Sequence, residues 1–180
     1  GTVGFIRDRI INYTNVCQAS CRFCAFHARA GQIDPYVLSL EEILLRVDEL
    51  VRAGGTQVML QGGLNPDIPF DSILHMVLQV KERFPSIYLH SFSPSEVIHF
   101  SRMEGISIDQ VITALRDAGV SSIPGASDIL VDRVRRQVCP LKITRDEWVS
   151  VIEAISRAGM KSSATMTYGL GETWEERVEH

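Results

Sequence analysis

Three of the four cysteines lie within eight residues, at Cys17, Cys21 and Cys24, and Phe23 directly precedes the third. Disulfide frameworks of secreted proteins spread their cysteines so that these can join distant loops. The ligands of one metal centre cluster instead, because one loop has to reach that centre. The spacing therefore predicts a metal site on a single loop, and a cluster of reduced cysteines indicates a cytoplasmic protein.

Three interpretations of this cysteine loop are open. Three thiolates can hold three irons of a [4Fe–4S] cube and leave the fourth open, and an open position distinguishes a catalytic metal from a structural one. If His27 is added, the same thiolates form a structural zinc site. The third interpretation is a loop of small residues without a metal, which the spacing disfavours. Cys139 stands apart and is expected to be a small, partly buried residue.

The composition excludes several classes of function. The chain has 180 residues, of which 45% are hydrophobic and 22% are charged, as in one globular domain with a full core. A net charge of −4 does not indicate a nucleic acid or an anionic membrane as a partner. No apolar run approaches the ~18 residues of a membrane span, and the first residues lack the apolar segment of a signal peptide.

The elements that must position the cysteines alternate between apolar runs and amphipathic segments. Strands are predicted at 9–14, 56–61, 87–92, 120–124 and 160–168. Helices are predicted at about 40–53, 71–84, 108–118, 129–138 and 145–158, and another begins near 173. This alternation predicts an α/β fold with a parallel sheet, either a barrel or an open sheet. The strands are expected to be apolar and covered on both faces.

Local signals mark the ends of these helices. Three pairs have the spacing of a capping box, namely Ser39 with Glu42, Ser107 with Gln110, and Thr144 with Glu147. Ala-Gly closes three helices, at 53–54, 118–119 and 158–159, where glycine can adopt the left-handed backbone that ends a helix. The repeated ending favours a fold of stacked β–α units.

Polar residues follow the carboxyl ends of the predicted strands, where both kinds of α/β fold bind ligands. They lie in the cysteine loop and in segments 61–66, 91–96, 124–128 and 167–173. This placement favours an enzyme. Because the chain stops within the last predicted helix, residues 1–180 are expected to be one core domain from the N-terminal part of a longer protein.

The cysteine motif resembles the signature of the radical S-adenosylmethionine (SAM) enzymes. In that family three cysteines hold a [4Fe–4S] cluster, SAM binds the open iron, and one electron cleaves SAM to a 5′-deoxyadenosyl radical. The resemblance implies a partial or complete β/α barrel, of which this chain supplies the first five or so β/α units. It further implies a flavodoxin- or ferredoxin-type electron donor, a small nucleoside substrate, and no nucleic-acid or membrane partner.

Longer segments resemble the family of cyclic dehypoxanthine futalosine synthases of menaquinone biosynthesis. They are "INYTNVC", "CRFCAF", "QGGLNPD", "ERFPSIYLHSFSPSE", "SIPGASDILVDRVRR" and "TRDEW", spread over nearly the whole chain. Aminofutalosine synthase and FO synthase are related alternatives. The implied reaction takes hydrogen from C4′ of the ribose, and the carbon radical then adds to the aromatic ring. The chain departs from the family pattern at Asp128, where glutamate is expected, and at Leu170 and Gly171.

The resemblance assigns Gln61, Gly62 and Gly63 to the aminoacyl end of SAM. Glycine suits this role because it lets a backbone approach a ligand closely. The alternative is a simple β–α turn. The same resemblance lets His27 face the adenine of SAM in place of a metal.

Two residues near the third strand are candidates for the base that the reaction needs, His90 and Glu96. A core histidine is the alternative for His90, and a cap of the helix that starts near Pro94 is the alternative for Glu96. The resemblance places Ser91 and its neighbours against the ribose or the substrate.

Asp128 and Arg133 are assigned to the amino and carboxylate groups of SAM. The planar fork of an arginine fits a carboxylate well. The alternative is a solvated helix face that Arg133 shares with Arg135 and Arg136.

Overall fold

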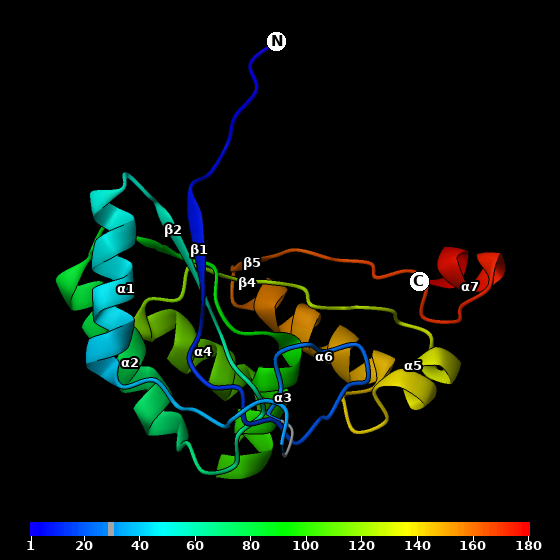
Figure 1. Cartoon of the computed structure of the whole chain (residues 1–180). Coiled ribbons are helices and arrows are strands. Elements are labelled where there is room, and N and C mark those ends of the chain that lie inside the picture. The colour runs from blue at the N-terminus through cyan, green and yellow to red at the C-terminus, as the bar shows by residue number, and fades with distance from the viewer. Residues whose placement is uncertain (29–30) are drawn as a thin grey trace.

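The computed structural model describes residues 1–28 and 31–180. Parallel strands alternate with helices along these residues, as the sequence predicts (Figure 1). In chain order they are β1 (Asp8–Asn12), α1 (Leu40–Arg52), β2 (Gln57–Gln61), α2 (Phe70–Arg83), β3 (Tyr88–Leu89), α3 (Pro94–Glu104), α4 (Ile108–Ala118), β4 (Ser122–Ile123), α5 (Asp132–Val138), α6 (Arg145–Arg157), β5 (Lys161–Ser162) and α7 (Trp174–Glu179).

The strands lie side by side in chain order. β1, β2 and β3 form one parallel sheet, and β4 pairs with β5 in a second. A parallel bridge between His90 and Ser122 joins the two sheets. The backbone N–H of Ser121 also donates to the carbonyl of Leu89 at 2.8 Å. The five strands therefore form one layer whose carboxyl ends all point the same way, which confirms the predicted parallel α/β fold.

Helices cover one face of this layer, where α1, α2, α4 and α6 pack (Figure 1). Along β2, Val58 and Leu60 are fully buried, while the alternate residues Gln57, Met59 and Gln61 are half-buried. On β1 the side chain of Ile10 is 57% exposed. The expectation that both faces are covered is therefore wrong. Cover on one face is the arrangement of a β/α barrel, in which the helices form an outer ring.

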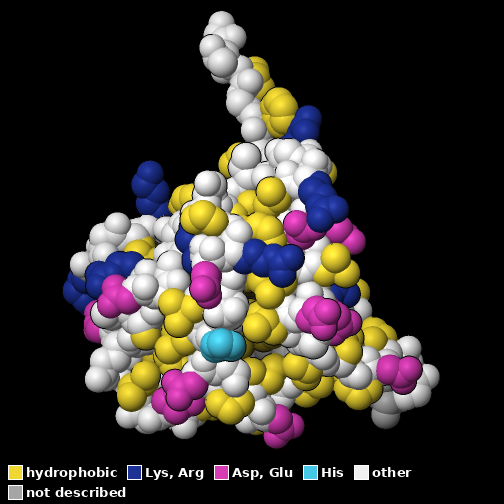
Figure 2. All heavy atoms as spheres, turned by 90° about the vertical axis from the view of Figure 1, so that its left-hand side faces the viewer, with side chains coloured by type: hydrophobic (Ala, Val, Ile, Leu, Met, Phe, Trp, Pro, Cys, Tyr) yellow, Lys and Arg dark blue, Asp and Glu magenta, His cyan; other side chains and the backbone are white. Residues whose placement is uncertain are grey.

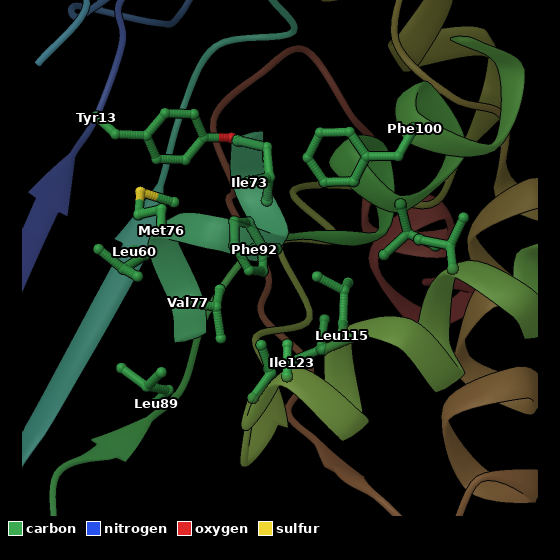
Figure 3. Close-up of a cluster of buried hydrophobic side chains, with 14 of the residues drawn as sticks. Tyr13, Leu60, Ile73, Met76, Val77, Leu89, Phe92, Phe100, Leu115 and Ile123 are labelled. Atoms are coloured by element: carbon green, nitrogen blue, oxygen red, sulfur yellow. The ribbon is translucent and has the colours of Figure 1, made fainter. Parts of the chain in front are cut away.

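A single large core lies between the strands and the helices (Figure 3). Phe92, just beyond β3, stands near its centre and contacts two aromatic rings edge-on, at 6.2 Å from Tyr13 and 6.0 Å from Phe100. Other labelled members are Leu60, Ile73, Met76, Val77, Leu89, Leu115 and Ile123. Because this core reaches the carboxyl ends of β1 and β3, it fixes the loops that leave them.

The helix signals in the sequence are confirmed. The three predicted capping boxes are present at α1, α4 and α6, with both hydrogen bonds in each. Gly54, Gly119 and Gly159 have φ of 76°, 115° and 70°, the left-handed backbone expected after these helices. α3 begins at Pro94, and its N-cap is Ser93, whose hydroxyl accepts from the N–H of Glu96. Glu96 therefore lies in the first turn, and the alternative in which Glu96 is the cap is wrong.

Four elements have other bounds than the sequence predicts, and α3 is not among the predicted helix ranges. β3, β4 and β5 have two residues each, and α5 begins at Asp132 and not near 129. The prediction of a nine-residue apolar fifth strand over 160–168 is wrong, because Lys161 and Ser162 are exposed. Within the described residues β5 pairs only with β4, so only one of its edges is hydrogen-bonded.

The outer surface over α1 and α2 mixes acidic and basic side chains with scattered apolar ones (Figure 2). The N-terminal residues before β1 extend away from the body, and Val3 and Phe5 are strongly exposed (Figure 1). Of the helices that the structure describes, none combines the length and the apolar character needed to cross a bilayer.

Candidate active site

The three clustered cysteines line one cavity of about 250 Å³ at the carboxyl ends of the strands. Loops that follow different strands form its walls. They contribute Thr14, Asn15 and the cysteines after β1, Gln61, Gly62, Gly63 and Leu64 after β2, Ser93, Ser95 and Glu96 after β3, and Ala126 and Asp128 after β4. The structure thus brings together most of the residues that the sequence placed at this edge.

The cysteine loop is closed by Asn15, which the sequence prediction did not include. Its Nδ2 donates to the carbonyl of Asp34 at 2.9 Å, and its Oδ1 accepts from the N–H of Tyr36 at 2.8 Å. Its own carbonyl accepts from Ala28 at 2.8 Å. This buried amide ties both ends of the loop to β1. The sequence offered one signal for the role of Asn15, namely the two polar residues Thr14 and Asn15 directly after an apolar strand.

Two glycines after β2 allow the cysteine loop to pack closely. A Cβ on Gly63 would lie 2.1 Å from the carbonyl oxygen of Val16, and one on Gly62 would lie 2.3 Å from Cζ of Tyr13. The N–H of Gly63 donates to the carbonyl of Thr14 at 2.9 Å. Any side chain at position 63 would therefore push the backbone beside Cys17 out of place.

Cys139 is fully buried against the cysteine loop. The N–H of Arg22 donates to the carbonyl of Val138 at 2.8 Å, which holds the end of α5 against the loop. The thiols of Cys139 and Cys21 share a hydrogen bond, and this bond together with burial raises the pKa of Cys21. A metal centre at Cys21 must therefore displace a proton when it binds.

The described donors do not surround a single point. Among residues 1–28 and 31–180, no group of three or more His, Cys, Asp or Glu side chains is arranged to hold one metal ion. A structural zinc needs its four donors on one tetrahedron, whereas each thiolate of an iron–sulfur cube binds a different iron. His27 lines the cavity and is buried. Its role, beside a metal or beside the adenine of SAM, stays a prediction.

Glu96 is the buried acid of the cavity, with 2% of its surface exposed. Its Oε1 accepts from the hydroxyl of Tyr13 at 2.8 Å and from the N–H of Gly62 at 3.0 Å. Its Oε2 accepts from the hydroxyl of Ser93 at 2.7 Å. Desolvation by burial outweighs these hydrogen bonds and raises the pKa of Glu96 to about 7. The group can therefore change its protonation state near neutral pH.

His90 and Ser91 do not line the cysteine cavity. His90 lies in a second cavity of about 630 Å³ with Tyr88, Ser122 and Lys161, and its Nδ1 is 2.6 Å from the hydroxyl of Ser122. Burial lowers the pKa of His90. Ser91 is fully buried, and its hydroxyl accepts from the N–H of Leu60 at 3.2 Å. In this structure both residues join neighbouring strands.

Asp128 faces the cavity, and its carboxylate forms an ion pair with Lys142, a residue that the sequence prediction missed. Arg133 does not line the cavity. Its guanidinium lies on the exposed side of α5, where it bonds the carboxylate of Glu176 at 2.6 Å and the carbonyl of Gly171 at 2.8 Å. Arg135, two residues on, is buried.

Curated relatives match nearly the whole chain but are about twice as long. A cyclic dehypoxanthine futalosine synthase of Halalkalibacterium halodurans is 42% identical over 98% of this chain and 48% of its own length. A 5-amino-6-(D-ribitylamino)uracil–L-tyrosine 4-hydroxyphenyl transferase of Cyanothece sp. is 42% identical over 99% of this chain and 49% of its own length. A transferase of the same name from Methanosarcina mazei is 43% identical over 99% of this chain and 47% of its own length.

Solved structures share the fold at low identity. Methylornithine synthase (PylB) superposes with a TM-score of 0.75 at 18% identity over 96% of this chain and 48% of its own. HydG, a maturase of the [FeFe]-hydrogenase, gives 0.72 at 15% identity over 94% of this chain and 36% of its own. SuiB from Streptococcus suis, solved with S-adenosylmethionine, gives 0.61 at 14% identity over 97% of this chain and 37% of its own.

The model of the radical SAM superfamily matches residues 11–180, which include the cysteine loop and every strand end of the cavity. Members of this family are enzymes that use a [4Fe–4S] cluster and SAM. With three cysteines on one loop at the carboxyl ends of parallel β/α units, the chain belongs to the radical SAM superfamily.

Proposed function

We propose that Cys17, Cys21 and Cys24 hold a [4Fe–4S] cluster and that SAM binds beside it in the cavity. The observation that supports this proposal is the shared cavity, into which one loop presents all three thiols. When bound, the cluster supplies the electron that cleaves SAM and yields a 5′-deoxyadenosyl radical. Gln61, Gly62 and Gly63 line the same cavity and remain our candidates for the aminoacyl end of SAM.

For the substrate, we propose dehypoxanthine futalosine, which the enzyme would cyclise to cyclic dehypoxanthine futalosine. The Halalkalibacterium relative supports this reaction, with 42% identity over 98% of the chain. The chain spans about half the length of the curated relatives that it matches, so it supplies part of the machinery of such an enzyme.

The second candidate reaction is transfer of the 4-hydroxyphenyl group of L-tyrosine to 5-amino-6-(D-ribitylamino)uracil. The relatives from Cyanothece sp. and Methanosarcina mazei carry this name at equal or slightly higher identity. Both reactions start from a nucleoside-like substrate and an aromatic ring, so the residues of the cavity alone favour neither.

We assign Glu96 as the base in the cyclisation. Once the C4′ radical has added to the ring, the adduct must lose one electron and one proton to give the cyclic product. The electron would pass to the oxidised cluster, and a carboxylate with a pKa of about 7 matches the removal of the proton. Phe23 and Phe26 line the cavity and supply apolar surface that limits the access of water. His90 remains the alternative base, from the second cavity.

Anaerobic purification tests the proposal in two stages. In the first, iron and acid-labile sulfide analysis should give four of each per chain. Dithionite and SAM should then release 5′-deoxyadenosine. A colourless protein with one zinc ion per chain would contradict the proposal.

In the second stage, the loaded enzyme is offered dehypoxanthine futalosine, or L-tyrosine together with 5-amino-6-(D-ribitylamino)uracil. Mass spectrometry should find a cyclic product that is lighter than the substrate by two hydrogen atoms, and it should find it from the first substrate only. Product from the tyrosine mixture alone would select the transferase. Cys21→Ala is the matched control, and it should release no 5′-deoxyadenosine in either mixture.

A further inference from the structure

Cys139 is a buried thiol that the proposed chemistry leaves unused. It caps the C-terminal end of α5 with 1% of its surface exposed, and it is the one cysteine of the chain outside residues 17–24. A buried cysteine packs like any small apolar residue, so packing alone would accept alanine here. Any role of the thiol itself must therefore come from the group that it contacts.

The thiol of Cys139 contacts one cysteine of the loop directly. It shares a hydrogen bond with the thiol of Cys21, and both side chains pack with Ala19 in a small apolar cluster. Both residues are thiols in this structure. Two sulfur atoms in hydrogen-bond contact need only a small further approach to reach the S–S bond length of about 2 Å. The two side chains are therefore arranged so that they can be cross-linked.

Backbone hydrogen bonds hold the two cysteines side by side. The N–H of Arg22, the residue after Cys21, donates to the carbonyl of Val138 at 2.8 Å. Val138 directly precedes Cys139, whose own N–H donates to the carbonyl of Arg135 at 2.8 Å. The contact between the thiols thus depends on the course of both chain segments and not on the rotamers alone.

Access to the two thiols differs. Cys21 lines the cavity together with Cys17 and Cys24, so a molecule as small as hydrogen peroxide can reach it. Cys139 is almost completely buried. A cysteine that an oxidant can reach, next to a second thiol that resolves its oxidised form, is the arrangement of cysteine redox sensors. In this pair, Cys21 has the position of the reactive residue and Cys139 that of the resolving one.

We infer that Cys139 forms a reversible disulfide with Cys21 when peroxide oxidises the cluster-free protein. Hydrogen peroxide first oxidises the thiol of Cys21 to a sulfenic acid, and one water molecule leaves. The thiol of Cys139 then attacks this sulfur, the S–S bond forms, and a second water molecule leaves. The peroxide takes up the two electrons that the sulfur atoms lose, and both thiol protons end in water. A dithiol reductant reverses the bond by exchange.

The disulfide controls cluster binding, and this part of the inference rests on the proposed function. While the sulfur of Cys21 is bonded to Cys139, it cannot bind iron, so one of the three thiolates that the cluster needs is missing. The bond also keeps Cys21 at a reversible stage of oxidation. A sulfenic acid that meets no thiol is oxidised further to a sulfinic acid, which a dithiol does not reduce. Cys139 thereby protects a proposed cluster ligand whenever the cluster is absent.

Peptide mapping of the oxidised protein tests the disulfide. Cluster-free protein is reduced, freed of reductant, treated with a stoichiometric amount of hydrogen peroxide, alkylated and digested with trypsin. Trypsin cleaves after Arg22, so Cys24 lies on a separate peptide from Cys21. Cys139 lies on the tryptic peptide of residues 137–142.

The expected product is the peptide of residues 10–22 linked to that of residues 137–142. Fragmentation should place the link at Cys21 and find Cys17 alkylated on the same peptide. A predominant link between any other two cysteines would overturn the inference. So would Cys21 recovered as a sulfinic acid without a link.

Two controls show whether the fold selects this pair. In urea, links within the cysteine loop should predominate, because closing a short loop costs less entropy. The double variant Cys17→Ala/Cys24→Ala keeps only the proposed pair, and oxidation should lower its intact mass by two hydrogen atoms. Adding Cys139→Ala to this variant should give a gain of oxygen in place of the loss of hydrogen. A gain of oxygen in the double variant itself would show that the two thiols do not meet, and the inference fails.

Recovery after oxidation tests the protective role. Both the unsubstituted protein and Cys139→Ala are oxidised and then reduced with dithiothreitol. The unsubstituted protein should return several times more Cys21 to the thiol form and should bind correspondingly more iron on anaerobic reconstitution. Equal iron binding by the two proteins before oxidation shows that the variant folds, and equal recovery afterwards would refute the role of Cys139. Failure of the proposed function looks different, because the reduced unsubstituted protein would then bind no cluster, while the peptide map still reports the disulfide.

Discussion

Glu96 shows how burial changes the chemistry of one side chain. The carboxylate accepts three hydrogen bonds, from Tyr13, Gly62 and Ser93, and each of them favours the ionised form. Desolvation is still the larger effect, and the pKa rises to about 7. The same bonds connect β1, the loop after β2 and the first turn of α3. Glu96 therefore combines a structural connection with a proton that can leave near neutral pH.

The raised pKa predicts how stability depends on pH. Because the folded state favours protonated Glu96, its contribution to stability is complete below pH 4.5 and is lost as the pH rises through about 7. That loss amounts to about 3 kcal/mol, since one pKa unit corresponds to about 1.4 kcal/mol. Glu96→Gln cannot ionise. Its free energy of unfolding in urea, measured in the cluster-free protein, should fall less between pH 4.5 and 8 than that of the unsubstituted chain. Parallel profiles would contradict the prediction.

Gly63 predicts a steric effect on cluster binding. In Gly63→Ala the new methyl group would lie 2.1 Å from the carbonyl oxygen of Val16, so the backbone next to Cys17 must move. The iron content after anaerobic reconstitution should therefore fall well below that of the unsubstituted protein. Gly4→Ala is the control, because no atom lies within 4 Å of its added Cβ. Equal iron content in the two variants would show that the loop tolerates the shift.

At the scale of elements, the helices begin and end where local chemistry specifies it. In each of α1, α4, α6 and α7, a Ser or Thr cap and a Glu or Gln three residues later exchange hydrogen bonds. Each cap fixes the residue at which the chain leaves a loop and enters a helix. The parallel pairing of β1 with β2 and β3, and of β4 with β5, holds the strand ends beside one another and so places the cavity walls.

Removal of one cap tests this account. Ser107→Ala removes the hydroxyl that accepts from the N–H of Gln110 at 3.2 Å at the start of α4. It should lower the free energy of unfolding by about 1 kcal/mol. Ser72→Ala is the control, because Ser72 is exposed within α2, where alanine is the better helix former. Urea denaturation of both variants gives the comparison, and equal stability would contradict the role of the cap.

At the scale of the whole molecule, the cysteine loop lies outside the large core. The core between strands and helices is formed without the loop, whose own apolar contacts involve a small separate cluster of Ala19, Cys21 and Cys139. The loop is attached mainly by the hydrogen bonds of Asn15, Leu64 and Val138. A group that binds the folded cysteine loop should therefore stabilise this loop more than it stabilises the large core.

Cluster removal is expected to lower the melting temperature, because a ligand that binds only the folded state stabilises that state. The measurement compares reconstituted protein before and after anaerobic treatment with a chelator and an oxidant. Limited proteolysis should then cut within residues 16–28 first. Cys24→Ala, which lacks one proposed ligand, should show little change under the same treatment. A melting temperature that does not respond in the unsubstituted protein would contradict this coupling.

The sequence by itself determined the alternation of strands and helices, although its helix ranges lack α3, and it determined the capping boxes and the Ala-Gly helix ends. These features depend on residues that are close in the sequence, within about one helical turn, so hydrophobic periodicity and residue spacing are enough to predict them. It also placed the cysteines, Gln61, Glu96 and Asp128 at strand ends, because parallel strands align their carboxyl ends. The cysteine motif, read as a resemblance, indicated the family that the comparison shows.

Only the tertiary structure decided which side chains meet. Lys142 reaches Asp128 across the loop and helix between them, and Cys139 meets Cys21 from a distant part of the chain. Of the arginines on α5, Arg135 is buried and Arg133 is solvated, although both lie in one basic run. No local sequence pattern predicts these partners, because they depend on how the loops fold back over the strand ends. Burial at the strand ends then sets both the pairing of charges and the pKa values.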